Sequence, residues 1–272
     1  MSGSAADRPR LIVNADDFGF TRDVNEGIVK AHRHGILTAT TLMANGAAFE
    51  HAVALAGESP SLDVGCHLVQ VQGQSLVDAT RALPATVKDL IRALTRREID
   101  VEGELRAQIR RILDAGIRPT HLDTHKHTHL LPPVLSAVAR LAREFGIPWV
   151  RRPFDFGIDA KASATKRLVT LGMRLTRPAF ATALKGLRST DHFTGFQITG
   201  ALGTSRLIET LERLPAGLTE FMCHPGYLGA ELQASRTRLK ESRALELAAL
   251  TSAEVRAVIE RRGILLTCYR EQ

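Results

Sequence analysis

Short apolar segments alternate with longer amphipathic segments along almost all of the 272 residues, and this alternation restricts the fold more than any other feature. The apolar segments have the length of strands. The amphipathic segments have helical spacing, as in residues 104–115, where Leu105, Ile109 and Ile112 mark one face. Alternating strands and helices predict a parallel sheet covered by helices. About seven or eight such units favour a TIM-like (β/α) barrel, with an open doubly wound sheet as the alternative.

The pattern shows neither an internal repeat nor a linker, so we expect one domain over residues 1–272. The predicted strands are 10–15, 36–44, 62–69, 120–127, 193–198, 218–223 and 264–268, with a short piece at 149–152. The predicted helices are 23–34, 49–56, 104–115, 134–145, 205–214, 239–250 and 252–262. Two insertions are predicted, an irregular one near 72–97 over one end of the sheet and a basic one near 161–190.

Composition narrows the class of protein. Apolar residues make up 44% of the chain, and no apolar run is long enough to span a membrane, which indicates a globular protein with a sizeable core. Three cysteines without a CxxC pair argue against a disulfide framework and, with a short polar N-terminus, favour the cytoplasm. The net charge of +7 indicates attraction to anions, but aromatic residues make up only 5%, so we expect no nucleic-acid partner.

The first predicted strand ends in two adjacent acids, Asp16 and Asp17, in the sequence N-A-D-D-F-G. Neighbouring residues of an extended strand point to opposite faces, so both carboxylates face one site only if the chain is already turning there. Gly19 makes such a turn easy. Two carboxylates at this place can divide the work, one binding a metal and the other taking a proton. The alternative is that both residues cap a helix or form a turn.

Histidines gather at the ends of three other predicted strands. The segment HLDTHKHTHL, residues 121–130, places side chains on alternate positions and hence on one face while it stays extended; these are His121, Asp123, His125, His127 and His129. Because barrel strands are short, we expect the later residues to fan out into a loop. His67 and His224 also follow apolar runs. Taken alone, His67 is more typical of a core histidine, and His224 could simply precede the turn at Pro225-Gly226. Two histidines and one aspartate with open positions are typical of a catalytic metal site.

Four motifs together resemble the YdjC-like carbohydrate deacetylases, which include chitooligosaccharide deacetylases and hopanoid-associated proteins of the HpnK type. They are N-A-D-D-F-G at 14–19, G-x-H-L at 65–68, H-L-D-T-H-x-H-x-H at 121–129 and C-H-P-G at 223–226. The resemblance runs in order from Leu11 to about Leu247. It implies a (β/α) barrel related to polysaccharide deacetylases, a divalent metal, and hydrolysis of an N-acetyl group on an amino sugar or a sugar-bearing lipid.

Carried over residue by residue, the resemblance implies that Asp17, His67 and His125 hold the metal. It also implies that Asp16 is the general base and that His224 is the acid. It points to magnesium, whereas the softness of two imidazole ligands suits Zn, Mn, Fe or Co better. Further candidates for contacts with the substrate are Asn14, Asp123, His127 and Arg152.

Two features leave alternatives open. A metal-dependent phosphoesterase on a similar barrel would also use His and Asp at strand ends, and an anionic substrate would suit the net charge of +7. The segment 161–190 carries seven basic residues and no acidic ones, and we expect Pro178 to divide it into two helices. Leu168, Leu171 and Leu175 share helical spacing there. The segment is therefore either an ordinary barrel helix with a solvated basic face or a surface that docks on an anionic membrane. The sequence leaves the sugar and the oligomeric state open, a homodimer included.

Overall fold

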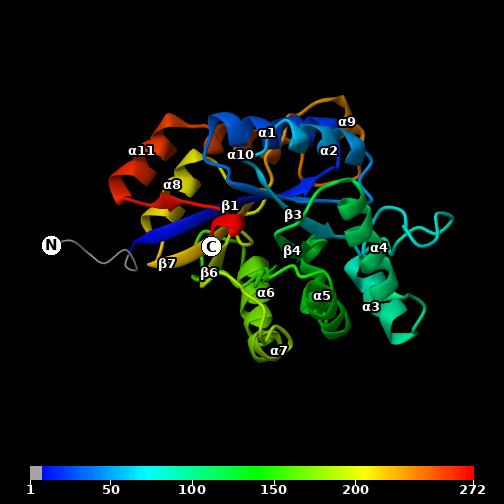
Figure 1. Ribbon diagram of the computed structural model, residues 1–272. Coiled ribbons are helices and arrows are strands. Elements are labelled where there is room, and N and C mark those ends of the chain that lie inside the picture. Colours follow the sequence, from blue (N-terminus) through cyan, green and yellow to red (C-terminus); the bar gives the residue numbers. More distant parts are fainter. Residues whose placement is uncertain (1–7) are drawn as a thin grey trace.

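The computed structural model describes residues 8–272, and its centre is a curled parallel sheet surrounded by helices (Figure 1). The strands follow the order β5-β4-β3-β2-β1-β7-β6, and β8 pairs with β1. A bridge between Asp155, which follows β5, and Phe193 in β6 brings the two edges of the sheet together. This confirms the predicted (β/α) barrel over the open sheet. The strands are β1 (Pro9–Phe18), β2 (Ala39–Leu42), β3 (Asp63–Leu68), β4 (His121–Thr124), β5 (Trp149–Val150), β6 (His192–Thr194), β7 (Gly217–Cys223) and β8 (Leu265–Leu266).

Helices occupy the connections between strands, as expected for parallel strands (Figure 1). They are α1 (Arg22–His34), α2 (Phe49–Gly57), α3 (Val87–Thr95), α4 (Val101–Asp114), α5 (Pro132–Glu144), α6 (Ala164–Arg174), α7 (Arg177–Ala183), α8 (Thr204–Glu212), α9 (Ala230–Ala234), α10 (Glu241–Leu250) and α11 (Ala253–Arg262). Two short 3₁₀ helices cover His125–Leu130 and Tyr269–Glu271. Within residues 8–272, no helix is both long and apolar enough to cross a membrane.

The two predicted insertions have different outcomes. The prediction that 72–97 is irregular is wrong for 87–95, which form α3. The signal was a helix N-cap: the Thr86 hydroxyl accepts a hydrogen bond from the Asp89 backbone N–H and donates one to the Asp89 carboxylate. The segment 161–190 does divide into two helices. The first ends at Arg174 and the second begins at Arg177, one residue before Pro178.

The interior of the barrel changes from apolar to charged along the strands. At one end lies a small cluster that is separate from the main core and contains Ile12, Trp149, Leu218 and Tyr269, along with Ala39. Residues two and four positions further along the same strands point to the same face. Asp16 in β1 and Glu220 in β7 therefore point into the interior, further along the strands than the apolar Ile12 and Leu218. Polar side chains placed in this way build the site.

The end of β1 turns as the sequence predicted, but the turn begins at Asp17 itself. Pairing with β2 shifts register between Ala15 and Phe18, and Asp17 has a left-handed φ of 71°. Aspartate is among the few residues other than glycine that tolerate this region. At Gly19, φ is 94°, and a Cβ there would lie 3.0 Å from the carbonyl oxygen of Met43. The backbone therefore brings two consecutive carboxylates to one site.

A close approach of α1 to the loop that follows β7 gives a first prediction. A Cβ on Gly27 would lie 2.4 Å from the Cα of Gly226, two residues beyond His224. We expect Gly27→Ala to lower the free energy of unfolding by about 1–3 kcal/mol, because backbone atoms must move apart to admit the methyl group. Urea unfolding measures this. Gly57→Ala is the control, since a Cβ there meets nothing within 4 Å. Equal unfolding midpoints for Gly27→Ala and the parent protein would contradict the prediction.

Candidate metal and catalytic site

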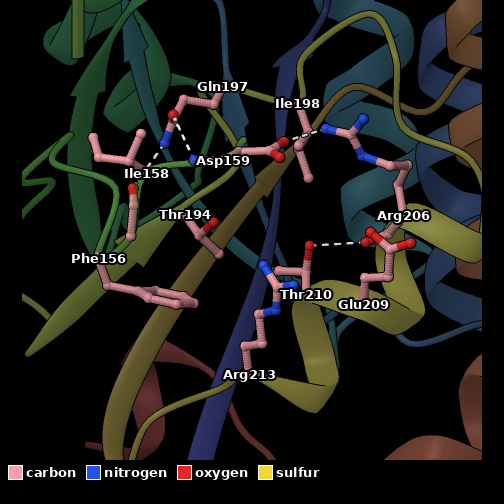
Figure 2. A pocket seen from close by; sticks show the side chains of 12 residues that line it. Phe156, Ile158, Asp159, Thr194, Gln197, Ile198, Arg206, Glu209, Thr210 and Arg213 are labelled. Carbon is pink, nitrogen blue, oxygen red and sulfur yellow. Dashed lines mark hydrogen bonds and ion pairs between the residues drawn. The ribbon is translucent and has the colours of Figure 1, made fainter. Parts of the chain in front are cut away.

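A small pocket between residues 156–159 and α8 carries charged side chains, and most of them already have partners (Figure 2). Arg206 donates to the carboxylate of Asp159. Glu209 is bonded to Lys161, and Gln197 accepts from the Asp159 backbone N–H at 2.9 Å. The cavity measures about 90 Å³, and of its four charged lining residues only Arg213 forms no ion pair among the described residues. The pocket therefore offers no unpaired carboxylate.

A larger cavity of about 560 Å³ opens where the carboxyl ends of β1, β3, β4 and β7 converge. This is the edge at which parallel barrels place their active sites. Its lining contains six of the residues that the sequence analysis singled out, namely Asp16, Asp17, His67, His125, His127 and His224. The sites predicted from separate motifs therefore meet in one cavity.

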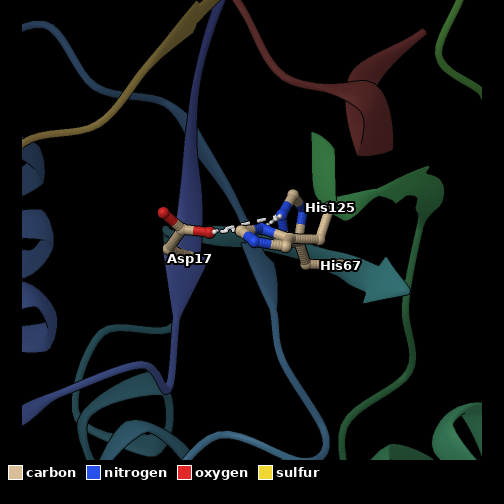
Figure 3. Close-up of side chains that lie close together, drawn as sticks. All are labelled: Asp17, His67 and His125. Carbon is tan, nitrogen blue, oxygen red and sulfur yellow. Dashed lines mark hydrogen bonds and ion pairs between the residues drawn. The ribbon is translucent and has the colours of Figure 1, made fainter. Parts of the chain in front are cut away.

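Three atoms from three elements surround one point in this cavity (Figure 3). Oδ1 of Asp17 lies 3.3 Å from Nε2 of His67 and 3.2 Å from Nδ1 of His125. The two histidine nitrogens are 3.3 Å apart. Atoms that bind one ion at about 2.1 Å lie about 3.0 Å apart in an octahedron and about 3.4 Å apart in a tetrahedron. The spacing fits three ligands on one side of a metal ion.

The hydrogen bonding of the same three residues leaves their inner atoms available. Oδ1 of Asp17 is buried and has no hydrogen-bond partner among the described residues, while its Oδ2 accepts from Arg243 at 2.5 Å. Nδ1 of His67 lies 2.7 Å from a carboxylate oxygen of Asp123. Because a carboxylate accepts, the proton of the neutral ring is on Nδ1, and Nε2 is then the nitrogen that can offer a lone pair to a metal. The chemistry of this donor set therefore fits a divalent metal.

Charge in the surrounding network favours a cation as well. The buried guanidinium of Arg151 contacts three carboxylates, while Arg243 contacts only that of Asp17. Four buried carboxylates thus face two buried guanidinium groups; the carboxylates are Asp16, Asp17, Asp123 and Glu220. Uncompensated charge is costly in the interior, so this excess of carboxylates favours a cation at the site.

The pKa of His67 responds to this excess of negative charge. Burial by itself lowers the pKa of His67, but the carboxylates of Asp123, Asp16 and Asp17 outweigh burial and raise it to about 10. For Asp17 the directions are reversed. Burial raises its pKa, but Arg243 and the neighbouring histidines outweigh burial and lower this pKa well below its usual range. The point between these side chains therefore attracts positive charge.

Asp16 and His224 line the same cavity as Asp17, His67 and His125. Arg151 binds both carboxylate oxygens of Asp16, at 2.7 and 2.8 Å. Burial raises the pKa of Asp16, but Arg151 outweighs it, so the group is ionised at neutral pH. Nε2 of His224 lies 4.0 Å from Oδ2 of Asp16, and burial lowers the pKa of His224 to about 4. A carboxylate that can accept a proton and an imidazole that can relay one face the same cavity.

A second set of possible ligands, Asp16, His67 and Asp123, is less suitable for a metal. Arg151 already contacts both of its carboxylates at 2.6–2.8 Å. A cation placed there would face the guanidinium directly, and like charges at such distances repel strongly in a buried site. The set that contains Asp17 is therefore the better metal site.

Of the four residues expected to contact the substrate, only His127 lines the cavity. Asn14 lies beneath it and donates to Asp16 at 3.2 Å, and Asp123 lies behind His67. Arg152 lies elsewhere and donates to the backbone carbonyls of Thr190 and Asp191. We therefore withdraw Arg152, and we regard Asn14 and Asp123 as positioning residues.

Three charged residues of the site were not predicted from the sequence. Arg151 immediately precedes Arg152, which the sequence analysis proposed instead, and the side chain of Arg151 is fully buried. Glu220 lies in β7 and accepts from Arg151 at 2.6 Å. Arg243 comes from α10, far along the chain. Alternation along the strands could have found the first two, because Trp149 and Leu218 point into the barrel two residues earlier. No local signal marks Arg243.

Residues 10–261 match the YdjC-like protein family. The chain is 38% identical over 269 residues to a carbohydrate deacetylase of Brevibacillus brevis, which covers 96% of this chain and 99% of that protein. A carbohydrate deacetylase of Geobacillus stearothermophilus is 36% identical and covers 96% of each chain. A solved structure from Enterococcus faecalis V583, described as a candidate cellobiose-phosphate cleavage protein, superposes with a TM-score of 0.75 at 26% identity. That match covers 97% of this chain and 98% of the other.

Proposed function

Because the chain belongs to the YdjC-like family, we propose that it is a metal-dependent carbohydrate deacetylase that removes an N-acetyl group from an amino sugar or a sugar-bearing lipid. The observation that supports this most strongly is the meeting of Asp17, His67 and His125 around one point beside Asp16 and His224. The names of the curated relatives support the same reaction. They give no support to the phosphoesterase that the net charge suggested.

In the proposed mechanism, Asp17, His67 and His125 hold one divalent metal. Asp123 keeps the proton of His67 on Nδ1, so that Nε2 can bind. The metal would polarise the acetyl carbonyl and lower the pKa of a water molecule. The family resemblance points to magnesium, whereas two imidazoles suit Zn, Mn, Fe or Co.

The protein's own groups then move the protons. Asp16 is ionised and takes a proton from the attacking water. Burial holds the pKa of His224 at about 4, so this histidine acts as an acid only after it has received a proton. Asp16, 4.0 Å away, can pass on the proton that it has taken. His224 then protonates the leaving amine, and the products are acetate and a free amino sugar.

Metal removal tests this proposal. We expect the purified protein to release acetate from N-acetylated chitooligosaccharides, to lose this activity with a chelator, and to regain it with one divalent metal. His67→Ala and His125→Ala should each lose both bound metal and activity while remaining folded. His34→Ala, at an exposed position, is the matched control. Full activity of either ligand variant with stoichiometric metal would refute the ligand assignment. Phosphatase activity on an aryl phosphate with no acetate release would refute the deacetylase.

A further inference from the structure

Helix α6 presents its apolar side to solvent, the reverse of an ordinary helix on a barrel. Leu168, Leu171 and Leu175 are 71%, 50% and 82% exposed, and Val169 beside them is also exposed. The opposite side of the helix packs inward through Met173, which is buried. The spacing that the sequence revealed is therefore real, but the leucines do not face the core. We call these four exposed residues, together with Arg167, the α6 face.

Polar contacts fix this orientation of the helix. Nζ of Lys166 donates to the backbone carbonyls of Gln197 and Thr199 at 3.0 and 2.6 Å, and Lys166 lines the catalytic cavity. Thr170 is buried one turn later. Turning the leucines inward would expose Met173 and break the contacts of Lys166. The exposure of the leucines is thus a consequence of the way the helix is anchored.

Positive charge borders the apolar residues without acidic compensation. At 100° per residue, Arg167 and Arg174 lie along one edge of the row of leucines. Lys161 is the single basic residue of 161–190 that forms an ion pair within the described chain, and its partner is Glu209. The segment itself contains no acidic residue. In Figure 1, α6 and the neighbouring α7 lie at one edge of the molecule, away from α1 and α11.

The charges decide between the two partners that could cover such a face. A symmetric contact with a second copy would place the same patch against itself and bring like charges together. An anionic bilayer instead offers apolar chains to the leucines and negative headgroups to the arginines. We propose that the α6 face is a docking surface for a membrane that contains anionic lipids. This surface is independent of the proposed deacetylation.

Vesicle flotation tests the docking surface with the full-length protein. We expect binding to vesicles of phosphatidylcholine mixed with phosphatidylglycerol at low salt, and much weaker binding at high salt or to phosphatidylcholine alone. The triple variant Leu168→Asn, Leu171→Asn, Leu175→Asn should lose roughly tenfold or more in partitioning. It should stay folded by circular dichroism, because these side chains are exposed. The matched control replaces Val77, Leu245 and Leu265 with Asn, at exposed apolar positions outside the face.

Charge reversal at an arginine provides the second part of the vesicle-binding experiment. Arg167→Glu should weaken binding to the anionic vesicles by roughly tenfold, whereas Arg118→Glu, at another exposed arginine, should have a much smaller effect. Absence of binding to anionic vesicles at low salt would overturn the proposal. So would triple-variant binding equal to that of the parent protein. A dimer in solution that dissociates in the triple variant, with no vesicle binding by the parent, would assign the face to a second copy instead.

Discussion

Asp16→Asn is expected to keep the bound metal and to lose about 10²–10⁴-fold in turnover, the usual contribution of a positioned general base. The amide cannot take a proton, whereas the three proposed ligand atoms of Asp17, His67 and His125 are untouched. Acetate release gives the rate, and elemental analysis of the dialysed protein gives the metal content.

Asp17→Asn is the matched comparison, since it makes the same chemical change at the adjacent residue. It removes the negative charge of Asp17, which is both the proposed metal ligand and the partner of Arg243. We expect it to lose metal first and activity as a consequence, with partial recovery when metal is added in excess. If Asp16→Asn loses the metal and Asp17→Asn retains it, the two carboxylates have exchanged roles. The adjacency of the residues makes this comparison necessary.

Those parts of the site that depend on short stretches of sequence were predictable. Strand ends carry Asp16, Asp17, His67 and His224, and parallel strands bring such ends together at one edge. The end of β4 shows the limit of this reasoning. Alternation predicted a shared face only while the chain stayed extended, and the strand ends at Thr124, three residues earlier than predicted. Lys126 and His127 then adopt left-handed conformations.

The supporting charges depend on register and on contacts between distant segments. β5 has only two residues, so alternation along it gives little indication of which of the two adjacent arginines turns inward. The structure shows that Arg151 follows Trp149 into the barrel, while Arg152 points away. Arg243 meets Asp17 across 226 positions of the chain. Helical spacing in 161–190 identified an apolar row correctly, but not its direction. Lys166, whose contacts fix that direction, looks in the sequence like any other surface lysine.

Arg151→Met is expected to produce the largest loss of stability, about 3–5 kcal/mol in the free energy of unfolding near neutral pH. The guanidinium lies between three buried carboxylates at 2.6–2.8 Å, and its removal leaves them facing one another. Arg152→Met is the control, because this neighbour donates only to backbone carbonyls and should cost much less. Urea unfolding of both variants and the parent gives the comparison.

The pH dependence of the Arg151→Met deficit separates loss of charge from loss of packing. In the parent protein, Arg151 holds the folded-state pKa of Asp16 below its unfolded value, so this contribution is present at neutral pH and is lost only in strong acid. Without Arg151, burial raises the pKa of Asp16, and the variant gains protons there as the pH falls. Burial already raises the pKa of Glu220 to about 7 in the parent protein, so that group titrates in both proteins. The difference in unfolding free energy should therefore shrink between about pH 7 and about pH 5. A deficit that stays constant over this range would mean that Arg151 stabilises the barrel by filling space rather than by neutralising carboxylates.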